Sequence, residues 1–149
     1  MKGSIVSSGT ASGSIPLVEG SNTLLIEVTA ENGATIKTYK VEVTREVVVD
    51  AVTPVISTQP VGATVTEGDA SPTLRVVATT SDAGTLSYQW YSNTTDSEAG
   101  ATLITGATSN TYSAPTEDAG TTYYYVVVTN TNTAATGVKT APMTSTRVA

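Results

Sequence analysis

The chain has 149 residues, no Cys, His or Phe, and 7 Lys and Arg against 13 Asp and Glu, which gives a formal charge of -6. It therefore lacks thiolate nucleophiles, imidazole bases, Cys/His zinc sites and disulfides. An acidic chain without a basic run is a poor partner for nucleic acids or anionic membranes. With 39% hydrophobic and only 13% charged residues, the composition indicates a folded protein of one domain or two small ones.

Alternating apolar and polar residues predict strands along the whole chain, and helical periodicity is absent. The runs 24–29 and 39–44 alternate in this way, and Asn32-Gly33 between them suits a type I′ turn. Residues 24–44 are therefore predicted to form a β-hairpin. The side chains expected on the inward faces of its two strands are Leu24, Ile26 and Val28, and Tyr39, Val41 and Val43.

The strand spacing changes at Pro54, and residues 46–53 are predicted to be a linker that precedes it. After the linker, clusters of Gly, Asp, Asn and Ser separate short predicted strands. Seven or more short strands within about a hundred residues are typical of a β-sandwich. The predicted strands lie near residues 55–59, 63–67, 73–79, 85–92, 101–105, 109–113, 121–129 and 138–148.

Residues 54–149 resemble a bacterial immunoglobulin-like domain, and three local sequences carry the resemblance. Residues 87–91 (SYQWY) resemble strand C, and residues 74–78 (LRVVA) resemble strand B. Residues 118–125 (DAGTTYYY) resemble the corner between strands E and F with the start of strand F. The resemblance implies an all-β fold with an immunoglobulin-like Greek-key β-sandwich.

The same resemblance implies a core in which Val76 and Tyr125 take the places of the two usual cysteines, with Trp90 between them. Tyr123 would be the corner tyrosine of strand F. Tyr124 is the alternative, because this sequence has one residue more than the common spacing. The large aromatic side chains would offset the missing disulfide, which removes several kcal/mol in the chain-entropy model.

If Trp90 and Tyr125 point into the core, alternation places five neighbouring residues on the outer face of the same sheet. Two tyrosines and two valines are an unusual outward patch for a solvated sheet. We expect this face to be covered by loops or by residues 1–45, with a ligand platform for a protein or a glycan as the alternative. The five candidate binding residues are Gln89, Tyr91, Tyr124, Val126 and Val128.

Residues 1–45 resemble the C-terminal half of the cadherin-like β-sandwich repeat of bacterial surface proteins. The segments that carry this resemblance are 8–13, 17–22 and 26–45. Half a sandwich leaves an apolar face and open strand edges. Residues 1–45 are therefore expected to pair with the neighbouring domain, with a second copy of the chain, or with upstream sequence of a parent protein. The acidic calcium-binding motifs of true cadherins are not visible.

Catalysis is not expected, because the paired carboxylates all lie in predicted turns, where such groups usually bond backbone amides. A glycosidase instead needs two carboxylates that face each other across a cleft. The pairs are Asp96 and Glu98, Glu117 and Asp118, and Glu67 and Asp69.

Loop carboxylates without calcium-loop spacing predict no metal site, and exposed lysines predict no isopeptide bond. The carboxylates concerned are Asp69, Asp82, Asp96 and Glu98, and the lysines are Lys37, Lys40 and Lys139.

These observations favour a non-catalytic structural or adhesive module, without metal or cofactor, in a secreted or cell-surface bacterial multidomain protein. The expected partners are neighbouring domains, with another protein or a glycan as further alternatives, and neither nucleic acid nor membrane insertion is expected. The resemblance implies an extracellular or wall-associated location, and the residues after Met1 are not expected to form a signal peptide. The alternative function is a carbohydrate-binding accessory module of a polysaccharide-degrading enzyme.

Overall fold

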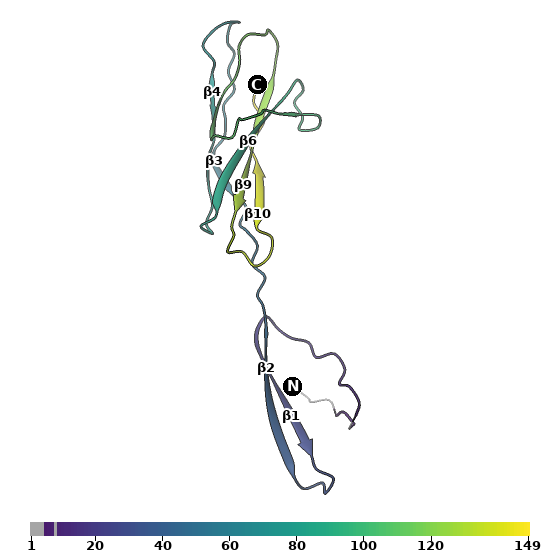
Figure 1. Cartoon of the computed structure of the whole chain (residues 1–149). Coiled ribbons are helices and arrows are strands. Elements are labelled where there is room, and N and C mark those ends of the chain that lie inside the picture. Colours follow the sequence, from purple (N-terminus) through teal and green to yellow (C-terminus); the bar gives the residue numbers. More distant parts are fainter. Residues whose placement is uncertain (1–4, 8) are drawn as a thin grey trace. The chain divides into compact units, whose positions relative to one another are not determined.

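A computed structural model describes residues 5–7 and 9–149 of the chain. The chain divides into two compact units, Met1–Val47 and Val48–Ala149. In the described residues of both units, the regular secondary structure consists of strands alone, which run from β1 to β10 in chain order (Figure 1). The prediction of an all-β protein is confirmed.

The first unit is built on one antiparallel hairpin, β1 (Gly20–Thr29) and β2 (Ile36–Arg45). Opposite residues of an antiparallel pair share a face, so the register Leu24↔Val41 and Ile26↔Tyr39 collects the apolar side chains on one side, as predicted. A good part of this apolar face is open to solvent: Ile26 and Val28 are each 50% exposed, and Tyr39 is 49% exposed.

The turn of the hairpin is longer than the predicted two-residue turn. Residues 30–35 form it, and the amide of Ala30 donates to the carbonyl of Thr35 at 2.8 Å. The side chain of Asn32 accepts hydrogen bonds from the amides of Ala34 and Thr35. A type I′ turn needs a positive φ at both central residues, whereas here only Gly33, at +70°, has one. The Asn32 side chain thus orders the loop in place of a left-handed Asn backbone.

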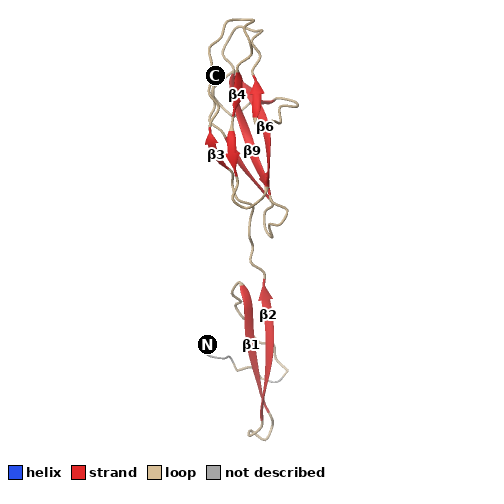
Figure 2. Ribbon diagram, turned by 90° about the vertical axis from the view of Figure 1, so that its left-hand side faces the viewer, coloured by secondary structure: helices blue, strands red, loops and turns tan. Residues whose placement is uncertain are grey.

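The second unit holds two strand layers (Figure 2). One layer is an antiparallel sheet in the order β10-β9-β6-β7, and the other pairs β3 with β5 and β4 with β8. Because β4 and β5 are consecutive pieces of one strand interrupted at Val76, this order is an immunoglobulin-like Greek key. The bounds are β3 (Val55–Thr58), β4 (Thr73–Arg75), β5 (Val77–Thr79), β6 (Thr85–Asn93), β7 (Thr102–Leu103), β8 (Thr111–Ser113), β9 (Tyr123–Thr131) and β10 (Thr140–Thr144).

The core lies between these two layers and is centred on Trp90. The indole is fully buried, its Nε1–H donates to the carbonyl of Ser109 at 2.9 Å, and its ring stacks on Tyr112 at 5.9 Å. Val76, which is also fully buried, contributes from the facing layer. The buried residues of this cluster are Leu74, Val76, Trp90, Ala114, Tyr124, Val126 and Val128.

The predicted facing of β9 needs correction by one residue. Val126, and not Tyr125, lies opposite Trp90 in the β6–β9 register, so Val126 has the core position that the sequence analysis gave to Tyr125. Tyr124 and Val128 therefore point into the core with it, contrary to their predicted outward facing. Tyr123 and Tyr125, predicted as core residues, belong by alternation to the outer face. The extra residue before β9 shifts its inward-facing positions by one. This agrees with the alternative assignment, in which Tyr124 is the corner tyrosine.

The chain enters the second unit beside the segment that precedes β10. The amide of Gly137 donates to the carbonyl of Val49 at 3.0 Å. The amide of Ala51 donates to the carbonyl of Val138 at 2.7 Å. Residue numbers rise together on the two sides, so the two segments run parallel. Residues 48–53, which the sequence analysis places in the linker, are thus joined to the sandwich by hydrogen bonds.

The carboxylate of Asp82 strengthens this junction from the turn between β5 and β6. Its hydrogen bonds join three separate parts of the second unit, and they hold the pKa of Asp82 far below its ordinary value, with the bond from the Val52 amide as the largest cause. Its donors are the amides of Val52 and Gly84, the hydroxyl of Thr80, and the side-chain amides of Asn130 and Asn132. Asp82 is therefore occupied as a structural acceptor.

Candidate functional site

The outer face of the four-stranded sheet is the surface where the sequence placed its binding residues. The pairs Gln89↔Val127 and Tyr91↔Tyr125 lie on this face, on the opposite side from Trp90. Of the five predicted residues, the structure brings only two, Gln89 and Tyr91, to this surface. The others lie in the core for the reason given above: Tyr124, Val126 and Val128. Tyr123, Tyr125 and Val127 take their places.

Two tyrosines form the centre of this face. The rings of Tyr91 and Tyr125 stack with centroids 5.1 Å apart and planes within 7° of parallel. Tyr125 is only 6% exposed although it lies on the outer side of the sheet. Burial raises the pKa of Tyr125, and the nearby Glu98 and Tyr91 add to the rise, whereas Arg147 opposes it. Other parts of the second unit therefore cover this ring.

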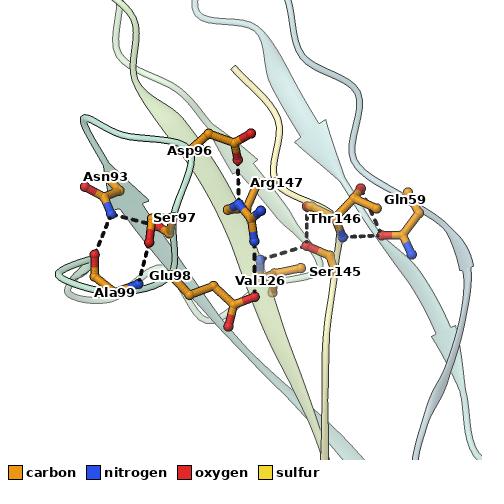
Figure 3. A network of polar contacts seen from close by, with 10 residues as sticks. All are labelled: Gln59, Asn93, Asp96, Ser97, Glu98, Ala99, Val126, Ser145, Thr146 and Arg147. Carbon is orange, nitrogen blue, oxygen red and sulfur yellow. Dashed lines mark hydrogen bonds and ion pairs between the residues drawn. The ribbon is translucent and has the colours of Figure 1, made fainter.

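Glu98, in the loop between β6 and β7, and Arg147 both lie close enough to Tyr125 to act on its pKa. Figure 3 shows how Arg147 is joined to this loop. The Arg147 guanidinium bonds two loop carboxylates: Nε lies 2.5 Å from Asp96 Oδ1, and Nη1 lies 3.4 Å from Glu98 Oε1. The side chain of Asn93 shapes the loop, because its Nδ2 donates to the carbonyls of Ser97 and Ala99. The two carboxylates raise the pKa of Arg147, chiefly through the hydrogen bond to Asp96.

A local bulge aims Arg147 at this loop. The amide of Ser145 donates to the carbonyl of Val126 at 2.9 Å, and Val148 exchanges two backbone hydrogen bonds with Tyr124. Three steps along the last segment thus face two steps along β9, which is the signature of a β-bulge. The extra residue turns Thr146 toward Gln59, whose Oε1 accepts its amide, and Arg147 toward the loop (Figure 3).

Gln89, the polar member of the outer face, is already engaged within the sheet. Its Nε2 donates to the carbonyls of Ile104 at 2.9 Å and of Trp90 at 3.0 Å. The side-chain amide therefore ties β6 to the residues that follow β7.

Two of the paired carboxylates considered for catalysis accept hydrogen bonds from neighbouring backbone amides. Asp69 accepts the amide of Thr66, and Glu117 accepts the amide of Thr116, as carboxylates in turns do. Within the part of the chain that the structure describes, no group of three or more acidic residues is placed to hold a metal ion.

The three lysines considered for an isopeptide bond make other contacts. Lys139 Nζ donates to the carbonyls of Thr133 and Ala135, and Lys37 lies over the ring of Tyr39 at 6.0 Å. Lys40 pairs with Glu42 at 2.6 Å, and both side chains are exposed.

Comparison with protein-family models matches residues 1–46 to the cadherin-like beta sandwich domain. No curated protein and no solved structure matches the chain. Among the described residues there is no helix long and apolar enough to cross a membrane. The family match confirms the cadherin-like part of the resemblance, and it indicates a structural or adhesion module for the first unit.

Proposed function

We propose that the chain is a non-catalytic structural module of an extracellular or wall-associated bacterial protein, in which it spaces and displays neighbouring domains. We further propose that its second unit belongs to the bacterial immunoglobulin-like family. Three features support this assignment: the buried Trp90 on β6, Tyr124 at the start of β9, and the Greek-key order of the strands. The cadherin-like match of the first unit supports a modular surface protein.

The observation that carries the proposal is the way in which the second unit holds its first and last segments. Close to Val49 the chain runs parallel to residues 136–138, as described above. Further along, the amide of Ala63 donates to the carbonyl of Ala149 at 3.0 Å. Tension between residues 48 and 149 therefore loads these hydrogen bonds together, along the segments. Such a geometry resists extension better than bonds that break one at a time, which suits a load-bearing spacer.

Single-molecule force spectroscopy tests this proposal with two pulling geometries on the full chain. In Val47→Cys/Ala149→Cys the load acts lengthwise along the parallel segments. In the matched pair Val47→Cys/Ala134→Cys both attachment points lie at the same end of the segments, so the bonds break in sequence. We expect a clearly higher unfolding force in the first geometry. Equal forces in both would contradict a load-bearing role.

A carbohydrate-binding accessory module is the second candidate, and the stacked Tyr91 and Tyr125 rings are the observation that favours it. Aromatic side chains with a few polar neighbours are common in binding sites. A glycan array with the wild-type chain and Tyr91→Ala separates the two candidates. Binding that disappears in Tyr91→Ala supports the carbohydrate reading, and silence across plant, wall and mucin glycans leaves the structural module.

A further inference from the structure

We propose that Arg147 is an ionic strap that holds residues 94–101, here called the cover loop, closed over Tyr125. When the strap is released, the stacked Tyr91 and Tyr125 rings become exposed without unfolding of the core. The ionic strength of the surroundings then sets how often this aromatic pair is open. The inference goes beyond the proposed function, because it concerns the outer face and holds whether or not the module carries load.

The burial of Tyr125 is local and separate from the core. Its ring is not part of the buried cluster around Trp90, yet it is 6% exposed. Its neighbours come from three elements: Tyr91 from β6, Glu98 from the cover loop, and Arg147 from the last segment. On the opposite side of the same strand, Tyr124 belongs to the core cluster and is 8% exposed. Uncovering one tyrosine therefore does not require uncovering the other.

The cover loop is joined to the last segment by ion pairs that are accessible to solvent. The bonds from Asn93 to Ser97 and Ala99 shape the loop from within. The bonds that tie it to the last segment are the two ion pairs of Arg147. The side chain of Arg147 is 34% exposed, and those of its partners are 62% and 52% exposed. Ion pairs that are this accessible to water contribute little each and are screened by salt.

The charged groups around Arg147 favour the closed position of the cover loop. Asp96 and Glu98 attract the guanidinium, and the Tyr125 phenol adds no charge near pH 7, because burial and the nearby Glu98 raise its pKa above the ordinary value. The geometry therefore contains one cation, two anions and an aromatic pair beneath them. Loss of the cation removes both ion pairs between the loop and the last segment and leaves two like charges side by side in the loop.

Tyrosine nitration by tetranitromethane, localised by fragment-ion mass spectrometry, measures the opening. The test variant is Arg147→Gln, and the matched control is Arg75→Gln, which removes the same charge from the exposed Arg75 on β4. Tyr124, next in sequence and on the core side, reports any general unfolding. We expect Arg147→Gln to raise the nitration rate of Tyr125 about fivefold, with Tyr124 unchanged and Arg75→Gln equal to wild type.

Salt and a reciprocal variant complete the experiment. In about 1 M NaCl, where the Debye length is about 3 Å, wild-type Tyr125 should react at nearly the rate seen in Arg147→Gln, and that variant should no longer respond to salt. Asp96→Asn/Glu98→Gln, which keeps the arginine, should behave like Arg147→Gln. The proposal is overturned if Tyr125 reacts at the wild-type rate in both variants, or if Tyr124 and Tyr125 rise together.

Discussion

The two units of the chain start from the same sequence pattern and reach different degrees of burial. In the hairpin of the first unit, Ile26 and Val28 share a face with Tyr39, yet each of these side chains is about half exposed. In the sandwich of the second unit, Val126 and Val128 have no exposed surface. Alternation decides which side chains share a face, whereas burial requires a second layer to pack against that face.

The difference in burial indicates that most of the stability of the chain lies in the second unit. A two-stranded hairpin by itself is marginally stable in water, while two sheets with an apolar interior fold independently. Substitutions in the second unit should therefore cost much more free energy of unfolding than comparable ones in the first unit.

The largest expected effect is at Trp90. Trp90→Ala removes a fully buried ring that stacks on Tyr112 and donates a hydrogen bond to Ser109, and it should lower the free energy of unfolding by about 3–5 kcal/mol. Tyr39→Ala on the hairpin is the control, with an expected loss of about 1 kcal/mol or less. Urea unfolding followed by far-UV circular dichroism measures both. Similar losses of free energy of unfolding for the two variants would contradict the proposed difference in stability between the units.

A smaller effect is expected at Gly84, where a Cβ would overlap the side-chain amide of the fully buried Asn130. Gly84→Ala should destabilise the second unit by about 1–3 kcal/mol, because the buried Asn130 side chain is held by hydrogen bonds to the Val52 carbonyl and the Asp82 carboxylate. Gly13→Ala is the matched control in the first unit, because no atom lies within 4 Å of the Cβ it would add. The single tryptophan reports the second unit in fluorescence-detected urea unfolding, where the control should match wild type.

The pH dependence of stability should single out Asp82. Hydrogen bonds lower its folded-state pKa, so its contribution is complete above the unfolded pKa of about 3.9 and is lost as the pH falls below that value. Wild type should lose stability more steeply below about pH 4 than Asp82→Asn, and the difference between them should narrow with acidity. Asp118→Asn, at an exposed turn, should keep the wild-type slope. Parallel curves for wild type and Asp82→Asn would exclude this role.

Much of the fold could be predicted because apolar and polar residues alternate along several of its strands. Apart from Leu25, the runs that form β1 and β2 alternate between apolar and polar residues, and the sequence around Trp90 resembles a known order of strands. The facing of β9 could not be predicted in the same way. Residues 123–128 read YYYVVV, so both faces are apolar or aromatic and alternation carries no information. A shift of one residue then exchanges the two faces completely.

The candidate site was harder to predict than the fold. Arg147 is separated by 51 residues from Asp96 and by 49 from Glu98, and only the closed sandwich brings them together. The bulge at 145–148 that aims the arginine has no local signal of Gly or Pro. Its position follows from the pairing of the last segment with β9, which a single sequence does not reveal.

The smallest expected effect tests the hairpin from its polar side. Lys40 and Glu42 form an ion pair at 2.6 Å, but their side chains are 59% and 61% exposed, so solvent screens the attraction. Lys40→Gln should change the stability of the hairpin by no more than about 0.5 kcal/mol, measured by hydrogen exchange of the β1 and β2 amides. Ile26→Ser, on the apolar face, should cost more. If Lys40→Gln costs more than Ile26→Ser, the polar side of the hairpin contributes more to its stability than the apolar side, and the exposure of the apolar side chains no longer explains the difference between the units.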